Sequence, residues 1–147
     1  MKLLFTILLI NTSIILAQNN NLENQNKTGS SSDWTAPASA NKLNNPLAGI
    51  SEATINGEKL FEQNCTSCHG NSGKGDGPTA DMLDTKPADL TSLKVQKESD
   101  GALFWKITTG KGAMASYKKD LSEEQRWHLV NYVRKLGEDS VNQNKRK

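Results

Sequence analysis

The stretch Cys65-Thr66-Ser67-Cys68-His69 decides what kind of domain this sequence forms. Two cysteines three positions apart lie on one face of a helical turn, so both thiols can add to the two vinyl groups of one haem. The histidine that follows the second cysteine is then held against the haem iron. We therefore expect one covalently attached haem c, with Cys65 and Cys68 as attachment points and His69 as the proximal iron ligand.

Two other kinds of site use the same residue types. A redox-active pair of cysteines usually lies at the start of a helix in a βαβ pattern, and no such pattern surrounds this motif. A structural zinc ion needs four ligands, and the residues that could supply them are Cys65, Cys68, His69 and His128. His128 lies far along the chain, within a predicted helix. Both sites remain alternatives to the haem.

The composition excludes several classes of protein. The chain has 147 residues, of which 35% are hydrophobic and 23% charged, and its mean hydropathy is −0.64. These values exclude a polytopic membrane protein. Eighteen Lys and Arg against 16 Asp and Glu give a net charge of +2, whereas a nucleic-acid binder carries a clear excess of clustered basic charge. Two cysteines are too few for a disulfide scaffold, so the fold depends on an ordinary core or a cofactor.

Residues 1–17 have the layout of a secretory signal peptide. A short basic start, Met1-Lys2, precedes an apolar stretch that begins at Leu3 and ends at the small residue Ala17. This stretch is shorter than the roughly 20 apolar residues that cross a bilayer. We therefore expect export to the periplasm, with a retained membrane anchor as the alternative.

The remaining residues divide into three parts. Residues 18–50 are rich in Asn and Ser, contain two prolines and hold few large apolar side chains, which predicts a flexible leader. Residues 51–138 are expected to form a mono-haem domain. Residues 139–147 end in three basic residues and are expected to form a disordered basic tail.

Capping and breaking residues predict several helices and no strand in the domain. The predicted helices cover residues 51–64, residues 100–109 and the stretch from the capping box Ser122–Gln125 to Gly137, with one further turn at residues 81–84. Gly110 stands where a C-terminal glycine ends a helix. Gly57 lies inside the first helix, where glycine costs about 1 kcal/mol relative to alanine, so another element should approach closely there.

The sequence resembles the class I c-type cytochromes, small proteins with a single haem, over residues 51–136. Besides the haem motif, the resemblance rests on Gly57 and Phe61 in the first helix and on Tyr132 in the last helix. It implies an all-α protein with the small cytochrome c fold, whose N- and C-terminal helices cross around one covalently bound haem. Such a crossing, with Tyr132 against Gly57, would explain the glycine.

The resemblance also implies a methionine as the second iron ligand, in the loop before the last helix. Met114 lies in such a loop, Gly110–Tyr117, although family members often have a proline where this chain has Ala113. Met82, just behind the glycine-rich loop of residues 71–78, and His128 are the alternative ligands. In the family the last helix faces the first helix rather than the iron, which argues against His128. We therefore expect Met114 to bind the iron.

Loops that follow the haem motif should complete the surroundings of the proximal histidine. In similar cytochromes a proline carbonyl accepts a hydrogen bond from the far ring nitrogen of the histidine, which orients the ring. Pro78 is the best match for that proline, and an ordinary turn proline is the alternative. Residues 86–91 resemble family loops that line the haem. Trp105 would either cover the haem or belong to the core.

Histidine and methionine together fill both axial positions of the iron and leave none for oxygen or peroxide. We therefore expect an electron carrier rather than an enzyme, working free or as a subunit of a respiratory oxidoreductase complex. The expected partners are a redox protein donor and acceptor, in particular membrane respiratory complexes, without nucleic acid or a small-molecule substrate. The alternatives are a haem enzyme or gas sensor with an open or displaceable sixth ligand, and a thiol–disulfide protein without haem.

Overall fold

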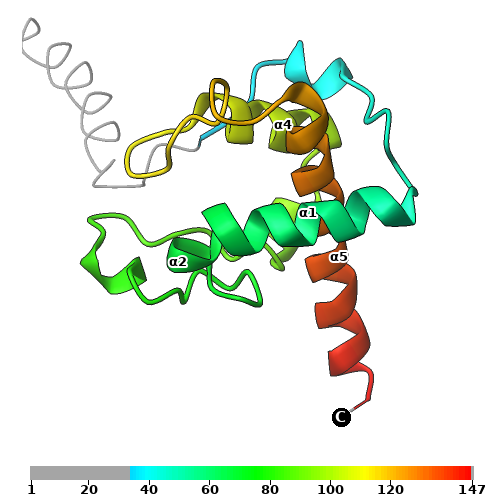
Figure 1. Ribbon diagram of the computed structural model, residues 1–147. Coiled ribbons are helices and arrows are strands. Elements are labelled where there is room, and N and C mark those ends of the chain that lie inside the picture. Colours follow the sequence, from blue (N-terminus) through cyan, green and yellow to red (C-terminus); the bar gives the residue numbers. More distant parts are fainter. Residues whose placement is uncertain (1–33, 147) are drawn as a thin grey trace, which may run out of the picture. The chain divides into compact units, whose positions relative to one another are not determined.

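Helices make up the regular structure of residues 34–146, the part of the chain that the computed structural model describes (Figure 1). The α-helices are α1 (Ser51–Asn64), α2 (Thr66–His69), α3 (Leu93–Gln96), α4 (Asp100–Thr109) and α5 (Glu123–Asn144), and the 3-10 helices are η2 (Ala40–Lys42) and η3 (Ala80–Met82). No strand occurs in these residues, and an isolated β-bridge joins Lys111 to Met114. The predicted all-α fold class is confirmed.

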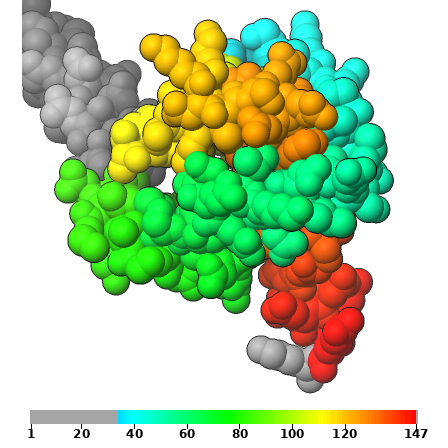
Figure 2. All heavy atoms as spheres, in the orientation of Figure 1, coloured from blue at the N-terminus to red at the C-terminus, as the bar shows by residue number. Residues whose placement is uncertain are grey.

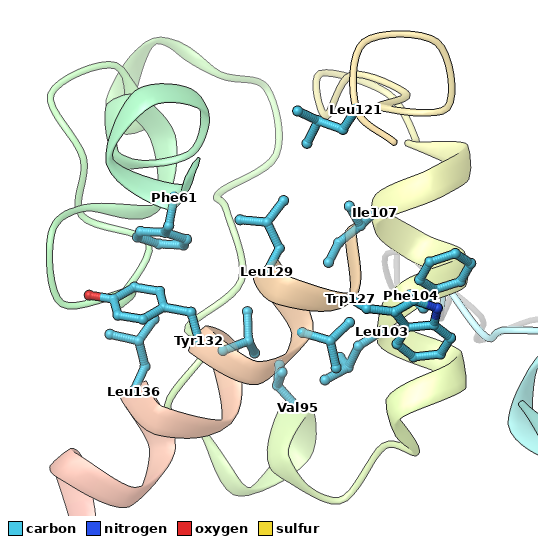
Figure 3. Close-up of a cluster of buried hydrophobic side chains, with 12 residues drawn as sticks. Phe61, Val95, Leu103, Phe104, Ile107, Leu121, Trp127, Leu129, Tyr132 and Leu136 are labelled. Carbon is cyan, nitrogen blue, oxygen red and sulfur yellow. The ribbon is translucent and has the colours of Figure 1, made fainter. Parts of the chain in front are cut away.

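Helices α1 and α5 cross where the sequence predicted, at Gly57. A Cβ atom on Gly57 would lie 2.0 Å from the carbonyl oxygen of His128 and 3.0 Å from Cβ of Tyr132. Next to the crossing, the rings of Phe61 and Tyr132 pack with centroids 5.2 Å apart (Figure 3). Glycine is therefore required here because the two backbones approach more closely than a side chain allows.

The ends of α4 and the start of α5 follow the sequence signals. Helix α4 ends at Thr109, and Gly110 caps it with a φ of 64°, a conformation that favours glycine. The side chain of Ser122 accepts a hydrogen bond from the amide of Gln125, whose own side chain accepts one from the Ser122 amide. This is the capping box that the sequence predicted.

Helix α5 continues to Asn144, beyond its predicted end at Gly137. Gly137 is buried within the helix, and a Cβ atom there would lie 2.4 Å from Cδ of Gln96. The glycine therefore makes room for a neighbour and does not end the helix. Residues 139–144 contain no glycine or proline, and they extend the helix instead of forming the disordered tail that we expected.

Residues 35–50 form an ordered arm against α4, where we expected the second half of a flexible leader. Residues 18–33 of that predicted leader lie outside the described residues. Ala36 and Ala40 are buried together with Ala102 of α4, and Trp105 packs against them. A Cβ atom on Gly101 would lie 2.0 Å from the carbonyl oxygen of Ala40. Alanine and glycine allow this close packing, which composition alone does not reveal.

Polar side chains tie the arm to α4 and α5. The Asn45 amide donates to Asp100 at 2.9 Å and to Asn131 at 2.7 Å, and Asn131 donates to the carbonyl of Leu47 at 2.6 Å. Arg134 donates to the other carboxylate oxygen of Asp100 at 2.8 Å. The arm is therefore fixed by hydrogen bonds between residues far apart in the sequence.

The main core lies between α1, α4 and α5 (Figure 3). Its buried members are Phe61, Val95, Leu103, Phe104, Ile107, Leu121, Trp127, Leu129, Val130, Tyr132, Val133 and Leu136. The rings of Phe104 and Trp127 stack with centroids 4.1 Å apart. The buried guanidinium of Arg126 lies over Phe104, 5.1 Å from the ring centroid.

The predicted signal peptide, residues 1–17, lies outside the described residues and stays a prediction. Within residues 34–146 no helix is both long and apolar enough to span a membrane.

Candidate haem site

The two cysteines and the histidine lie on one turn of backbone at the end of α1. Cys65 follows the last residue of α1, and the next four residues form α2. The amides of Cys68 and His69 both donate to the carbonyl of Cys65, at 3.2 and 2.8 Å. All three side chains are half-buried. The helical turn therefore presents both thiols and the imidazole together, as the spacing predicted.

The glycine-rich loop that follows is hydrogen-bonded back onto this turn. The amide of Gly75 donates to His69 at 2.9 Å, that of Gly77 to Cys68 at 3.1 Å, and that of Thr79 to Ser67 at 2.9 Å. A Cβ atom on Gly77 would lie 2.4 Å from the Ser67 carbonyl oxygen. The loop thus satisfies carbonyls that the end of a short helix leaves without partners.

One ring nitrogen of His69 is engaged by the backbone. Its Nδ1 lies 3.1 Å from the carbonyl oxygen of Ala88. Because a carbonyl only accepts, Nδ1 must carry the proton, and the lone pair of Nε2 is then available to a metal. Burial lowers the pKa of His69 below its ordinary value, while the hydrogen bond to Ala88 acts in the opposite direction. A neutral, oriented imidazole is the form that binds iron.

The hydrogen bond predicted from His69 to Pro78 is made to Ala88 instead. Pro78 is exposed in the glycine-rich loop. Residues 87–90 form a second layer over that loop, since the Leu90 amide donates to Gly73 at 2.7 Å and a Cβ atom on Gly75 would lie 2.3 Å from the Pro87 carbonyl oxygen. The sequence feature that could have indicated Ala88 is the segment 86–91, which resembles loops that line the haem in the family.

The two candidate methionines lie in different surroundings. Met114 is half-buried and packs against the main core, as do Cys65 and Tyr117. Its backbone pairs with Lys111 through two hydrogen bonds of 2.9 and 3.0 Å. Met82, at the end of η3, is 76% exposed. In Figure 2, the yellow segment that contains Met114 and the green loops after the haem motif lie on the same side of the described part of the molecule.

The hydroxyl groups of Tyr117 and Thr79 lie near the haem motif and were not predicted from the sequence. The Tyr117 hydroxyl donates to the carbonyl of Asn64 at 2.8 Å. Burial raises the pKa of Tyr117, and so would negative charge on Cys65 and Cys68. The hydroxyl oxygen of Thr79 lies 3.3 Å from the sulfur of Cys68. No sequence motif marks either residue, because both reach the cysteines from loops.

The thiol of Cys65 is buried enough to change its acidity. Burial, followed by the charge of Cys68, raises the pKa of Cys65 to about 12. Without haem this thiol therefore stays protonated at neutral pH.

The alternative ligand His128 lies in α5, where its backbone packs against Gly57 and its Nε2 is 3.8 Å from Glu124. Within residues 34–146 no three or more His, Cys, Asp or Glu side chains gather in a way that could hold a metal ion. The four-ligand zinc site therefore has no support in this part of the chain.

A surface hollow of about 580 Å³ lies elsewhere, between the start of α1 and the middle of α5. Its lining includes Thr54, Glu58 and Lys135 but none of the five residues predicted to contact haem. The hollow therefore belongs to the helix crossing rather than to the candidate haem site.

The family model for subunit III of cbb3-type cytochrome c oxidase matches residues 52–133, more than half of the chain. The chain belongs to this cytochrome c family. It is 38% identical over 80 residues to cytochrome c6 of Anabaena variabilis, a match that covers 54% of this chain and 87% of the relative. Cytochrome c6 of Leptolyngbya boryana is 34% identical over 77 residues, which are 52% of this chain and 85% of the relative.

A solved structure is similar as well, the reducing HAO-like protein complex Kustc0457/Kustc0458 of Kuenenia stuttgartiensis. One of its chains matches with a TM-score of 0.58 and 33% identity, over 64% of this chain. The match spans 49% of that chain, about half of its length.

These findings make the protein a class I c-type cytochrome that carries covalently bound haem c and functions in electron transfer with redox protein partners. The described residues fit that cofactor. They present two thiols on one turn, an imidazole whose Nε2 lone pair is available, and a thioether on the same core. The haem supplies the electron that is gained and lost, and the protein supplies ligands and surroundings.

Proposed function

We propose that the chain is an exported electron carrier that holds one haem c through thioether links to Cys65 and Cys68, with His69 and Met114 as the axial iron ligands. The observation that carries this proposal is the hydrogen bond between His69 Nδ1 and Ala88. It orients the imidazole beside the two thiols and leaves Nε2 as the metal-binding atom. Pro78, in the loop after the motif, is proposed to border the haem without accepting this bond.

Methionine ligation rests on the contrast between two sulfur atoms. Met114 is half-buried against the core that Cys65 also contacts, whereas Met82 is 76% exposed. A thioether raises the reduction potential of haem iron relative to a second histidine. With both axial positions filled, the iron has no open site for a substrate, so the proposed role is electron transfer without catalysis.

The proposed location is the periplasm, reached through a signal peptide at residues 1–17. The similarity to cytochrome c6 and to the cbb3-type oxidase subunit III family supports respiratory or related redox proteins as donor and acceptor. The similarity to a chain of the HAO-like complex favours a second candidate, a subunit that passes electrons within a larger haem-containing assembly. Purification from membranes in mild detergent would separate the two, because a subunit should co-purify with partner chains.

Covalent attachment is tested by staining for haem peroxidase activity after denaturing gel electrophoresis. The wild-type protein should give a stained band, because thioether links survive denaturation. Cys68→Ala should give little or no mature haem protein, whereas the control Ser67→Ala, which alters the exposed residue between the two cysteines, should stain as strongly as wild type. A colourless wild-type band would refute the proposal.

A further inference from the structure

Tyr117 joins the segment that carries Met114 to the end of helix α1. Its side chain is half-buried and packs against the main core, as Met114 and Cys65 also do. The hydroxyl donates to the carbonyl of Asn64 at 2.8 Å, and Asn64 is the residue directly before Cys65. One hydrogen bond therefore connects the methionine segment, residues 110–117, to the backbone next to the haem motif.

Other hydrogen bonds of the same segment lead to α4. The amide of Tyr117 donates to the carbonyl of Ile107 at 3.2 Å, and the hydroxyl of Ser116 donates to that of Thr108 at 2.7 Å. Both acceptors lie in the last turn of α4. These bonds attach the segment to α4, but they do not set its distance from α1 or from the cysteines.

The Asn64 carbonyl is a suitable anchor because it lies at a helix end. The last carbonyls of a helix have no partner within it and are satisfied from outside. The neighbouring amides do not use it, since Cys65 donates to Phe61 and both Cys68 and His69 donate to Cys65. The Tyr117 hydroxyl donates to this carbonyl instead.

We propose that Tyr117 is a positioning residue that fixes the spacing between the methionine segment and the haem motif. The hydroxyl restrains the segment so that the sulfur of Met114 stays on the iron and resists displacement by other ligands. This inference rests on the proposed function, in which Met114 is an iron ligand. A phenylalanine at position 117 would keep the ring packing and lose the restraint.

The restraint can be measured as competition for the iron. A small neutral ligand such as imidazole binds only when the methionine has left, so its apparent affinity rises with the fraction of open segments. A net hydrogen bond contributes modestly to stability, so its loss should tighten imidazole binding about two- to tenfold. The change should appear in the binding constant and in the far-red absorbance of the methionine–iron bond.

The experiment titrates the oxidised haem-containing protein with imidazole while the far-red band is followed. Tyr117→Phe should bind imidazole about two- to tenfold more tightly than wild type. The matched control is Tyr132→Phe, which also removes one tyrosine hydroxyl, here one 3.4 Å from Glu58 at the helix crossing. This control should bind imidazole as wild type does, and denaturant unfolding of all three proteins would reveal any general loss of stability.

Three outcomes decide the matter. Tighter binding in Tyr117→Phe alone supports the inference. Equal imidazole affinity in Tyr117→Phe and wild type, or the same change in both variants, overturns it while leaving the ligand assignment intact. A wild-type protein without the far-red band refutes the methionine ligand itself, and the inference with it.

Discussion

At the scale of single residues, the close contacts explain which sequence features were informative. Gly57 stood out because a glycine weakens a helix, and the structure shows a backbone 2.0 Å from where its Cβ would be. The acceptor for His69 was misassigned to Pro78 because a carbonyl is present in every residue and carries no sequence signal. The carbonyl that accepts this hydrogen bond belongs to Ala88, and its position depends on how residues 87–90 lie over the glycine-rich loop.

Replacing Gly57 by alanine tests the helix crossing. The added Cβ would overlap the His128 carbonyl, so α1 and α5 must separate. We expect a net loss of about 1–2 kcal/mol in the free energy of unfolding, because overpacking against a backbone carbonyl costs about 2–3 kcal/mol and the gain in helix propensity returns up to about 1 kcal/mol. Denaturant unfolding of the haem-containing protein, followed by circular dichroism, measures the change.

The control for this variant is Gly49→Ala, at a glycine with a φ of 77° and no atom within 4 Å of an added Cβ. It introduces backbone strain of about 1–2 kcal/mol without overpacking, and it should leave the contact between α1 and α5 intact. Wild-type stability in Gly57→Ala would contradict the crossing as described.

At the scale of helices, local signals predicted elements that begin and end with their own caps. The bounds of α4 agree with the sequence because Ser99 caps its start and Gly110 its end, each within a single turn. Helix α1 also covers its predicted residues, but its N-cap is Ile50 and no side chain caps it. Helix α5 extends beyond its predicted end because Gly137 makes room for Gln96, which is 41 positions away in the sequence, and does not end the helix. Short helix α3 was not predicted, since four residues carry no periodic pattern.

The arm over residues 35–50 could not be predicted for a similar reason. Its composition is that of a linker, and its order comes from small side chains and amides that meet distant residues. Composition describes how much apolar surface a segment can bury, but it does not describe hydrogen bonds to a neighbouring helix.

Replacing Asn131 by alanine tests the attachment of the arm. The variant removes the hydrogen bond to Leu47 and the acceptor for Asn45, which leaves polar groups unsatisfied. We expect a loss of about 1–3 kcal/mol in unfolding free energy and faster proteolysis within residues 35–50. Asn142→Ala, in the exposed last turns of α5, is the matched control and should change stability by less than about 0.5 kcal/mol. Similar stabilities for the two variants would argue against the arm contact.

At the scale of the whole molecule, the net charge of +2 is too small to guide a partner from afar. Any electrostatic guidance must come from local groups. The exposed residues Lys118 and Lys119 follow the methionine segment, and Lys74 is exposed in the glycine-rich loop. We expect these lysines to favour an acidic partner surface near the haem.

Charge reversal at Lys118 and Lys119 tests this expectation. The double change to glutamate should lower the bimolecular electron-transfer rate at low ionic strength, and the difference should shrink as salt shortens the screening length from about 10 Å at 0.1 M. The control reverses Lys145 and Arg146, which alters net charge equally at the far end of α5. Equal rates for the two double variants across the salt range would exclude a local docking patch.

The identity of the sixth ligand is the central claim, because it decides between an electron carrier and a haem protein with an open iron. The most direct measurement is the far-red absorbance of the oxidised protein in Met114→Ala and in Met82→Ala, each compared with wild type. The account predicts that Met114→Ala loses the band and lowers the reduction potential, whereas Met82→Ala, which changes an exposed side chain, keeps both. Loss of the band in Met82→Ala with its retention in Met114→Ala would contradict the account.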